Sequence, residues 1–166
     1  MNKDNENFVI NEEISEHIEK IKKKFPSDKN KSSIIESLLL LQHKNNGYVT
    51  KAIMKSLARY LDINEIDVYE VATFYSMINT EPVGENIISV CTNVSCMLKN
   101  SKKILEHIEK KLQTKTGNTT KDNKFFIKNE IECLAACDGA PMMQINHKNY
   151  ENLTIEKVDK ILEELK

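Results

Sequence analysis

The stretch V-C-T-N-V-S-C-M-L-K-N, residues 90–100, places Cys91 and Cys96 in a short polar loop with four residues between them. This interval does not suit the two commonest uses of a close cysteine pair, because thioredoxin-like redox dithiols and most zinc knuckles separate their cysteines by two residues. The chain has two more cysteines, Cys133 and Cys137. The full set therefore reads C-x4-C, 36 residues of other sequence, and C-x3-C, so that every cysteine belongs to one of two pairs.

The composition indicates a globular chain in a reducing compartment. Hydrophobic residues make up 40% of the 166 residues, which is enough for a core. The longest apolar run, residues 34–41, is interrupted by Glu36 and Ser37 and falls far short of the roughly 18 residues that a membrane span needs. The polar N-terminus has no features of a secretory signal or transit peptide. We therefore expect a soluble, cytosolic protein without disulfides, in which metal binding is the favoured use of the cysteines.

The charge distribution does not indicate a nucleic acid partner. The chain has 24 Lys and Arg and 25 Asp and Glu, a formal net charge of -1, and the two signs are interspersed. Nucleic acid binding requires positive charge concentrated in a stripe or patch. The four lysines of residues 20–24 fall at a predicted helix end, where cations interact favourably with the helix dipole.

Residues 11–78 repeat apolar side chains at three- and four-residue spacing, which predicts helices throughout. Polar N-caps and turn residues divide the stretch into four helices. The helices are expected to begin after Asn11, at about Ser32, after Thr50 and after Asn64, and the first two to end at Pro26 and at the N-N-G of residues 45–47. The pattern predicts an N-terminal four-helix bundle over residues 1–80.

The pattern changes after residue 80, where Pro82 and Gly84 mark a connector and a domain boundary. Strands are expected at residues 87–90, 125–132 and 141–146, and helices at residues 101–113 and from Thr154 onward. This order predicts a thioredoxin-like α/β domain over residues 81–166, and an α+β fold class for the whole chain. Both cysteine pairs begin where a strand ends, so parallel neighbouring strands would bring them to one edge, as a four-ligand site requires.

Four thiolates without a carboxylate suit zinc or an iron–sulfur cluster. Closed zinc sites tolerate two to four residues between paired cysteines, so spacing does not exclude zinc. Small and hydroxyl residues in both loops let backbone N–H groups approach inorganic sulfides, and the positive end of the helix expected near Ser101 favours a net-negative cluster. Those loop residues are Thr92, Ser95, Ala135, Ala136 and Gly139. The residues alone leave zinc and cluster both open.

The histidines and methionines are not expected to be ligands. A Rieske arrangement needs two histidines in place of two cysteines, whereas here four cysteines are already paired. We expect His17, His43, His107 and His147 at the surface. The six methionines, including Met142 and Met143, are expected to pack in the core or at an interface.

Four motifs carry a resemblance to a known family. They are Y-E-V-A-T-F-Y-S-M at residues 69–77, P-V-G at 82–84, V-C-T-N-V-S-C-M-L at 90–98 and E-C-L-A-A-C-x-x-A-P-M at 132–142. In this order they resemble the small [2Fe–2S] subunit of NADH dehydrogenase modules, as found in bacterial complex I. The resemblance covers nearly the whole chain and implies a thioredoxin-like ferredoxin domain. It implies that one [2Fe–2S] cluster is held by Cys91, Cys96, Cys133 and Cys137.

The resemblance also implies a function. The family places FMN and NADH on a larger partner subunit, and this sequence agrees because it has no G-x-G-x-x-G and only four glycines. We expect the cluster to accept single electrons from that flavin within an NADH:quinone oxidoreductase. The chain would be inactive alone, bound to the flavin-bearing and other subunits, and peripheral on the cytoplasmic (or matrix) face of the membrane.

Two alternatives stand beside this expectation. The same subunit type occurs in NAD-linked hydrogenases and formate dehydrogenases, although Y-E-V-A-T-F at residues 69–74 and C-M-L at residues 96–98 resemble the respiratory branch more closely. The alternative of another class is a zinc-stapled adaptor without a redox role. One departure from the family is Ala135, where many relatives carry Gly, and its methyl group is expected to shift the cluster potential slightly.

The helical half contains an unusually apolar segment. Residues 68–75 hold three aromatic and three apolar side chains, more than one helix face can bury in so small a bundle. The remainder is expected to form an exposed patch of the kind that marks a partner site. We expect the helices, through Tyr69, Phe74 and Tyr75, to dock the chain onto the flavin-bearing subunit.

Overall fold

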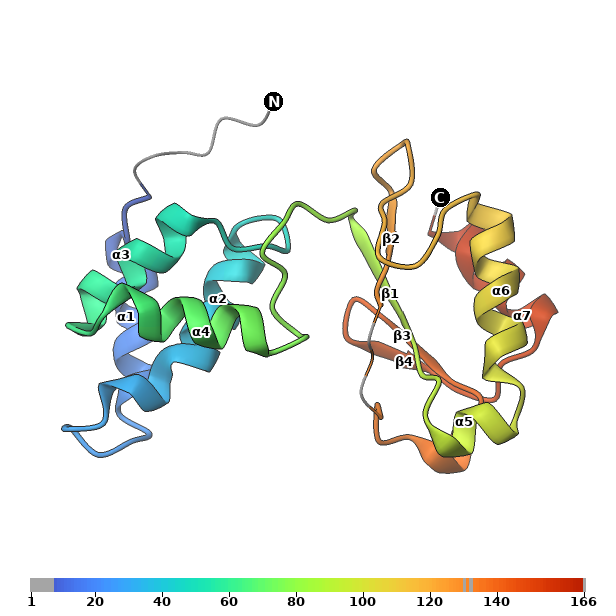
Figure 1. Ribbon diagram of the computed structural model, residues 1–166, viewed down its shortest axis with the longest axis horizontal. Coiled ribbons are helices and arrows are strands. Elements are labelled where there is room, and N and C mark those ends of the chain that lie inside the picture. The colour runs from blue at the N-terminus through green and yellow to red at the C-terminus, as the bar shows by residue number, and fades with distance from the viewer. Residues whose placement is uncertain (1–7, 130, 132, 166) are drawn as a thin grey trace. The chain divides into compact units, whose positions relative to one another are not determined.

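The computed structural model describes residues 8–129, 131 and 133–165 of the chain (Figure 1). The chain divides into two compact units, the first ending at Pro82 and the second beginning at Val83. Among the described residues, no helix combines the length and the apolar character needed to cross a bilayer.

The first unit is helical. Its elements are α1 (Glu12–Lys22), the 3-10 helix η1 (Asn30–Ser33), α2 (Ile34–Lys44), α3 (Lys51–Leu61) and α4 (Glu65–Phe74). The side chains of Asn11 and Thr50 cap α1 and α3 by accepting hydrogen bonds from the backbone N–H groups of Ile14 and Ile53. Apolar residues of all four α-helices share one core, including Ile18, Leu38, Leu57 and Val68.

Two helix ends differ from the sequence prediction. The helix α1 ends at Lys22 rather than at Pro26, and the chain then makes tight turns in which the N–H of Phe25 bonds to the carbonyl of Lys22. A residue before proline avoids the α-helical region, so the helix ends early. The second helix, expected from about Ser32, begins as the 3-10 turn η1 and becomes α-helical only at Ile34.

The second unit contains a mixed four-stranded sheet in the order β2-β1-β3-β4. Its strands are β1 (Asn86–Val90), β2 (Phe125–Ile127), β3 (Met143–Ile145) and β4 (Lys148–Tyr150). Strand β1 pairs in parallel with β2 and antiparallel with β3, and β3 forms a hairpin with β4. With the helices of the unit, this sheet gives the chain the mixed α and β content expected of a thioredoxin-like domain.

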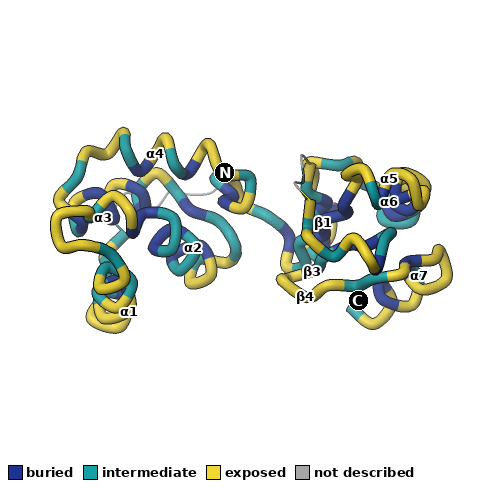
Figure 2. The backbone as a smooth tube through the Cα atoms, turned by 90° about the horizontal axis from the view of Figure 1, so that it is seen from below, coloured by how far each residue is buried: buried dark blue, intermediate teal, exposed yellow. Residues whose placement is uncertain are grey.

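Helices complete the second unit: α5 (Val94–Leu98), α6 (Ser101–Leu112), the 3-10 helix η2 (Cys137–Gly139) and α7 (Ile155–Glu164). The helices α6 and α7 lie side by side on one face of the sheet (Figures 1 and 2). Along α7 the buried positions Val158, Ile161 and Leu162 recur at helical spacing, while most other positions are exposed (Figure 2). These three side chains pack with buried strand residues in the core of the second unit.

Two predictions for the second unit are wrong, and one strand was not predicted. The strand expected over residues 125–132 ends at Ile127, and residues 130 and 132 of that prediction lie outside the described residues. Strand β4 was not expected, because its K-N-Y sequence is polar and largely exposed. The stretch between the first two cysteines, expected to be a loop, contains α5.

The structure shows why the connector between the two units contains glycine at position 84. A β-carbon on this residue would lie 2.7 Å from the carbonyl carbon of Phe125, closer than real β-carbons approach backbone atoms. Phe125 is buried and begins β2, and the N–H of Asn86 donates to the Lys124 carbonyl at 2.8 Å. The connector therefore needs glycine here to bring β1 alongside β2.

Candidate metal centre

The first cysteine pair is buried at the end of β1. Cys91 directly follows the strand, and its N–H donates to the Met142 carbonyl at 3.2 Å. Cys96 is the third residue of α5, so the short helix rather than an extended loop sets its direction. Both side chains are only 2% exposed.

The second pair lies on irregular backbone and is exposed. Five residues separate Cys133 from the end of β2, so this pair does not begin at the strand end as predicted. Cys137 is the first residue of η2. The Sγ atoms of Cys133 and Cys137 are 3.5 Å apart, and both residues are exposed.

The structure brings the two pairs into one neighbourhood. Cys91, Cys96 and Met142 form a small buried cluster, against which Leu134 and Ala136 of the second cysteine segment pack. The thiol of Cys91 also interacts electrostatically with the other three thiols. All four cysteines are free. Within residues 8–129, 131 and 133–165, however, no group of three or more His, Cys, Asp or Glu side chains is placed to hold a metal ion as it stands.

Burial dominates the electrostatics of Cys96. It raises the pKa of the Cys96 thiol to about 11, because a thiolate at that position loses its hydration. A hydrogen bond from the Met142 backbone opposes this shift, whereas the neighbouring thiol of Cys91 adds to it. The buried sulfur thus already has one backbone donor that would stabilise negative charge on it.

Hydrogen bonds dominate the electrostatics of the second pair. The pKa of the Cys133 thiol is lowered, first by a hydrogen bond from the Ala135 backbone and then by the Cys137 thiol. The pKa of the Cys137 thiol is raised, first by Cys133, while a hydrogen bond from the Ser95 hydroxyl opposes the rise. Hydrogen-bond donors to sulfur were expected within each cysteine loop. Ser95 instead lies on α5, in the first cysteine segment, and donates to Cys137 of the second pair.

Two small residues of the second segment have identifiable backbone roles. Ala135 has a φ of 57°, in the left-handed region that glycine adopts without a β-carbon penalty. A glycine at this position would adopt the same conformation without that penalty. A β-carbon on Gly139 would lie 2.6 Å from the Glu151 Cβ, so glycine is required there by tight packing.

The histidines lie apart from this arrangement. His17, His43 and His147 are exposed, as predicted. The prediction is wrong for His107, which is half-buried between α6 and α7, with its Nε2 2.8 Å from Asp159 Oδ1. The pattern of α6 alone did not show that α7 would supply this partner. Met142 and Met143 are buried, as predicted for core residues.

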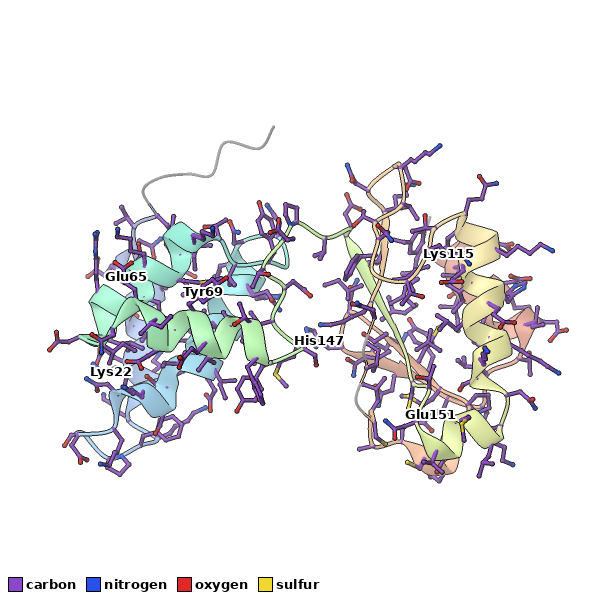
Figure 3. The ribbon with its side chains drawn as sticks, viewed as in Figure 1. Lys22, Glu65, Tyr69, Lys115, His147 and Glu151 are labelled. Atoms are coloured by element: carbon purple, nitrogen blue, oxygen red, sulfur yellow. The ribbon has the colours of Figure 1, made fainter. Side chains whose placement is uncertain are left out.

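Two groups of exposed apolar side chains stand out among the described residues. The first, here called the α4 patch, consists of Tyr69 and Phe74 on α4 and Tyr75 just after it, which are exposed as predicted. Phe74 is 80% exposed, and Tyr69 is labelled in Figure 3. Sequence reasoning missed the second group, Val94, Met97 and Leu98, because they lie on the short helix α5.

Comparison with known proteins gives a consistent family match. A family model described as thioredoxin-like [2Fe-2S] ferredoxin matches residues 18–166. The chain is 41% identical over 160 residues to the E subunit of NADH-quinone oxidoreductase from Rickettsia bellii, covering 96% of this chain and 95% of that protein. The Rickettsia typhi protein of the same name is 44% identical over 146 residues, covering 88% of this chain and 85% of that protein.

More distant matches include longer proteins. The mitochondrial NADH dehydrogenase [ubiquinone] flavoprotein 2 of Dictyostelium discoideum is 39% identical over 159 residues, covering 96% of this chain and 64% of that protein. Among solved structures, a chain of the air-oxidized NAD+-reducing [NiFe]-hydrogenase superposes with a TM-score of 0.65 at 19% identity. That match covers 77% of this chain and 22% of the hydrogenase chain, and it supports the fold alone.

Proposed function

Because the chain belongs to the thioredoxin-like [2Fe-2S] ferredoxin family, we propose that it transfers single electrons through one cluster held by Cys91, Cys96, Cys133 and Cys137. The main support for this proposal is that four free thiols from two separate segments lie near enough to interact with one another. Bound there, a [2Fe–2S] cluster supplies one-electron redox chemistry.

The donor set fits this group. All the donors are thiols, and a [2Fe–2S] cluster takes four thiolates spread over two irons rather than gathered on one ion. The Sγ atoms of Cys133 and Cys137 are 3.5 Å apart, which is close enough for both to bind one iron of such a cluster.

The chain's own residues would set the electrostatics around the sulfurs. The backbones of Met142 and Ala135 and the hydroxyl of Ser95 donate hydrogen bonds to cysteine sulfurs. Such donors stabilise negative charge on the ligands and raise the reduction potential, while burial of Cys91 and Cys96 lowers it. The exposed pair, Cys133 and Cys137, gives one side on which electrons can arrive.

We propose that the chain works as a subunit of an NADH:quinone oxidoreductase. The support is the name and length of the Rickettsia relatives, which this chain matches over nearly all of their sequence. FMN and NADH would lie on a partner subunit, and the isolated chain would not oxidise NADH. The assembly would place it peripherally on the cytoplasmic, or matrix, side of the membrane. The hydrogenase alternative rests on likeness of fold only.

We also propose that helices α1 to α4 form a four-helix bundle and dock the chain onto the flavin-bearing subunit. The α4 patch supports this role, because Tyr69, Phe74 and Tyr75 are exposed although aromatic side chains favour burial. Aromatic residues are enriched at protein interfaces. A surface of this kind would hold the cluster within electron-transfer reach of the flavin.

The direct experiment is anaerobic purification of the full chain. We expect a reddish-brown protein whose visible absorption bleaches when dithionite is added, and which contains no stoichiometric flavin. A colourless protein with one zinc per chain would support the adaptor alternative instead. Stoichiometric flavin on the single chain would contradict the assignment of flavin to a partner.

A further inference from the structure

The two cysteine pairs differ sharply in their access to solvent. Cys91 and Cys96 are each 2% exposed and pack against Met142. Cys133 and Cys137 are exposed, and their Sγ atoms are already in contact at 3.5 Å. A small reagent in solution therefore reaches the second pair and not the first.

We propose that, when no cluster is bound, a small-molecule disulfide oxidises Cys133 and Cys137 to a disulfide with each other and leaves Cys91 and Cys96 reduced. A protein disulfide bond is about 2.0 Å long, so the two sulfurs need to approach by about 1.5 Å. Both lie on irregular backbone and the single turn of η2, where so small a movement does not disturb a sheet or a long helix.

The reaction is an ordinary thiol–disulfide exchange. The thiolate of one exposed cysteine attacks a sulfur of the oxidant RSSR, forming a mixed disulfide and releasing RS⁻. The thiolate of the other exposed cysteine then attacks the protein sulfur of that mixed disulfide and releases the second RS⁻. The two cysteine thiols lose two protons and two electrons in total, and RSSR becomes two RSH.

The consequence is a block to metal loading. A Cys133–Cys137 bond removes two of the four thiolates, so a cluster could be inserted only after a reductant restores them. The oxidation itself concerns the metal-free chain. It therefore does not depend on which metal group the cysteines hold.

The test uses the full chain, stripped of metal, reduced and then exposed to oxidised glutathione. The remaining thiols are alkylated after denaturation, and the protein is digested with trypsin. Cleavage after Lys and Arg places the two pairs on separate peptides, residues 60–99 and 129–148. We expect peptide 129–148 without label and lighter by two hydrogens, and peptide 60–99 labelled at both cysteines. A disulfide within 60–99, a bond between the two peptides, or glutathione retained on both exposed cysteines would overturn the proposal.

Two matched variants test which thiols take part in the reaction. In Cys137→Ser the mixed disulfide has no exposed partner thiol, so we expect glutathione to remain on Cys133. In Cys91→Ser the bond between Cys133 and Cys137 should form as in the original chain. If Cys133 in the Cys137→Ser variant instead bonds to Cys91 or Cys96, the buried pair is accessible and the proposal is wrong.

Discussion

Gly139 packs against Glu151 so closely that a β-carbon on the glycine would lie 2.6 Å from the Glu151 Cβ. The same approach lets the N–H of Asn152 donate to the Gly139 carbonyl at 2.6 Å, and the N–H of Leu153 donate to the Pro141 carbonyl at 2.9 Å. The segment before α7 thus holds the backbone that carries Cys137.

Gly139→Ala should therefore destabilise the protein, by about 1–3 kcal/mol, which is typical of overpacking. Urea unfolding of the metal-free chain measures the change. The matched control is a double-mutant cycle with Glu151→Gly, which removes the clashing β-carbon. If Gly139→Ala costs as much in the Glu151→Gly background as in the original chain, the close contact is not the cause.

Ala135→Gly should stabilise the protein by about 0.5–1 kcal/mol, because relief of the left-handed conformation exceeds the entropy that glycine loses on folding. The neighbouring Ala136 has a φ of -117°, where glycine brings no relief, so Ala136→Gly should destabilise. Unfolding of both variants in urea checks the prediction. Equal effects of the two substitutions would show that the conformation of Ala135 is not strained.

Ser95→Ala should lower the reduction potential of the cluster-loaded protein, because it removes a hydrogen bond that stabilises negative charge on the Cys137 sulfur. Ser95→Thr keeps a hydroxyl and should restore most of the potential. A redox titration followed by EPR measures both variants. An unchanged potential in Ser95→Ala would mean that the hydroxyl does not act on the ligand.

Glu109 should make stability depend on pH. Its carboxylate accepts hydrogen bonds from Lys115 Nζ at 2.8 Å and from the Thr116 hydroxyl at 2.6 Å. Its pKa falls to about 2, with the bond from Lys115 as the largest cause. A lowered carboxyl pKa stabilises the fold fully above the unfolded value of 4.5, and the contribution is lost as pH falls from there to about 2.

Glu109→Gln should accordingly lower the Tm at pH 7 and reduce the loss of Tm between pH 5 and pH 3, as followed by circular dichroism. Glu16→Gln, at an exposed position of α1, is the control and should change neither value appreciably. Identical pH profiles for Glu109→Gln and the original chain would show that this carboxylate is not the responsible group.

Phe74→Ser should weaken binding to the flavin-bearing subunit at least about tenfold, the effect of losing one well-buried aromatic contact at an interface. The side chain is 80% exposed, so the substitution should not change the stability of the free protein. Met97→Ser on α5, where the side chain is 57% exposed, is the matched control. If Met97→Ser weakens binding and Phe74→Ser does not, docking must be assigned to the second unit.

The sequence predicted those features that depend on local patterns. Caps at Asn11 and Thr50 are confirmed, because each side chain accepts a hydrogen bond from a backbone N–H three residues along the chain. Asn64 precedes α4 as expected, but its side chain makes no capping hydrogen bond. The two cysteine pairs were recognised from the sequence, and their assignment as cluster ligands stays a prediction. Strand β1 followed from a short apolar run, and α6 and α7 followed from helical periodicity.

The missed features depend on contacts between distant segments or on very short elements. The helix α5 has only five residues, and three of its apolar side chains are exposed. It therefore lacks the amphipathic periodicity from which a helix is predicted. The bond from Ser95 to Cys137 and the pairing of His107 with Asp159 join segments more than 40 residues apart. Gly139 was interpreted as room for sulfide, whereas the structure shows that Glu151 requires it.

The central claim is that four cysteines hold one [2Fe–2S] cluster, and EPR of the dithionite-reduced full-length protein with iron and sulfide analysis tests it most directly. The original chain and His147→Ala should each show two irons, two sulfides and one reduced-cluster signal per chain. The signal should be lost or greatly diminished in Cys91→Ser, Cys96→Ser, Cys133→Ser and Cys137→Ser. An unaltered signal in any one of the four cysteine variants, or its loss in His147→Ala, would contradict the account.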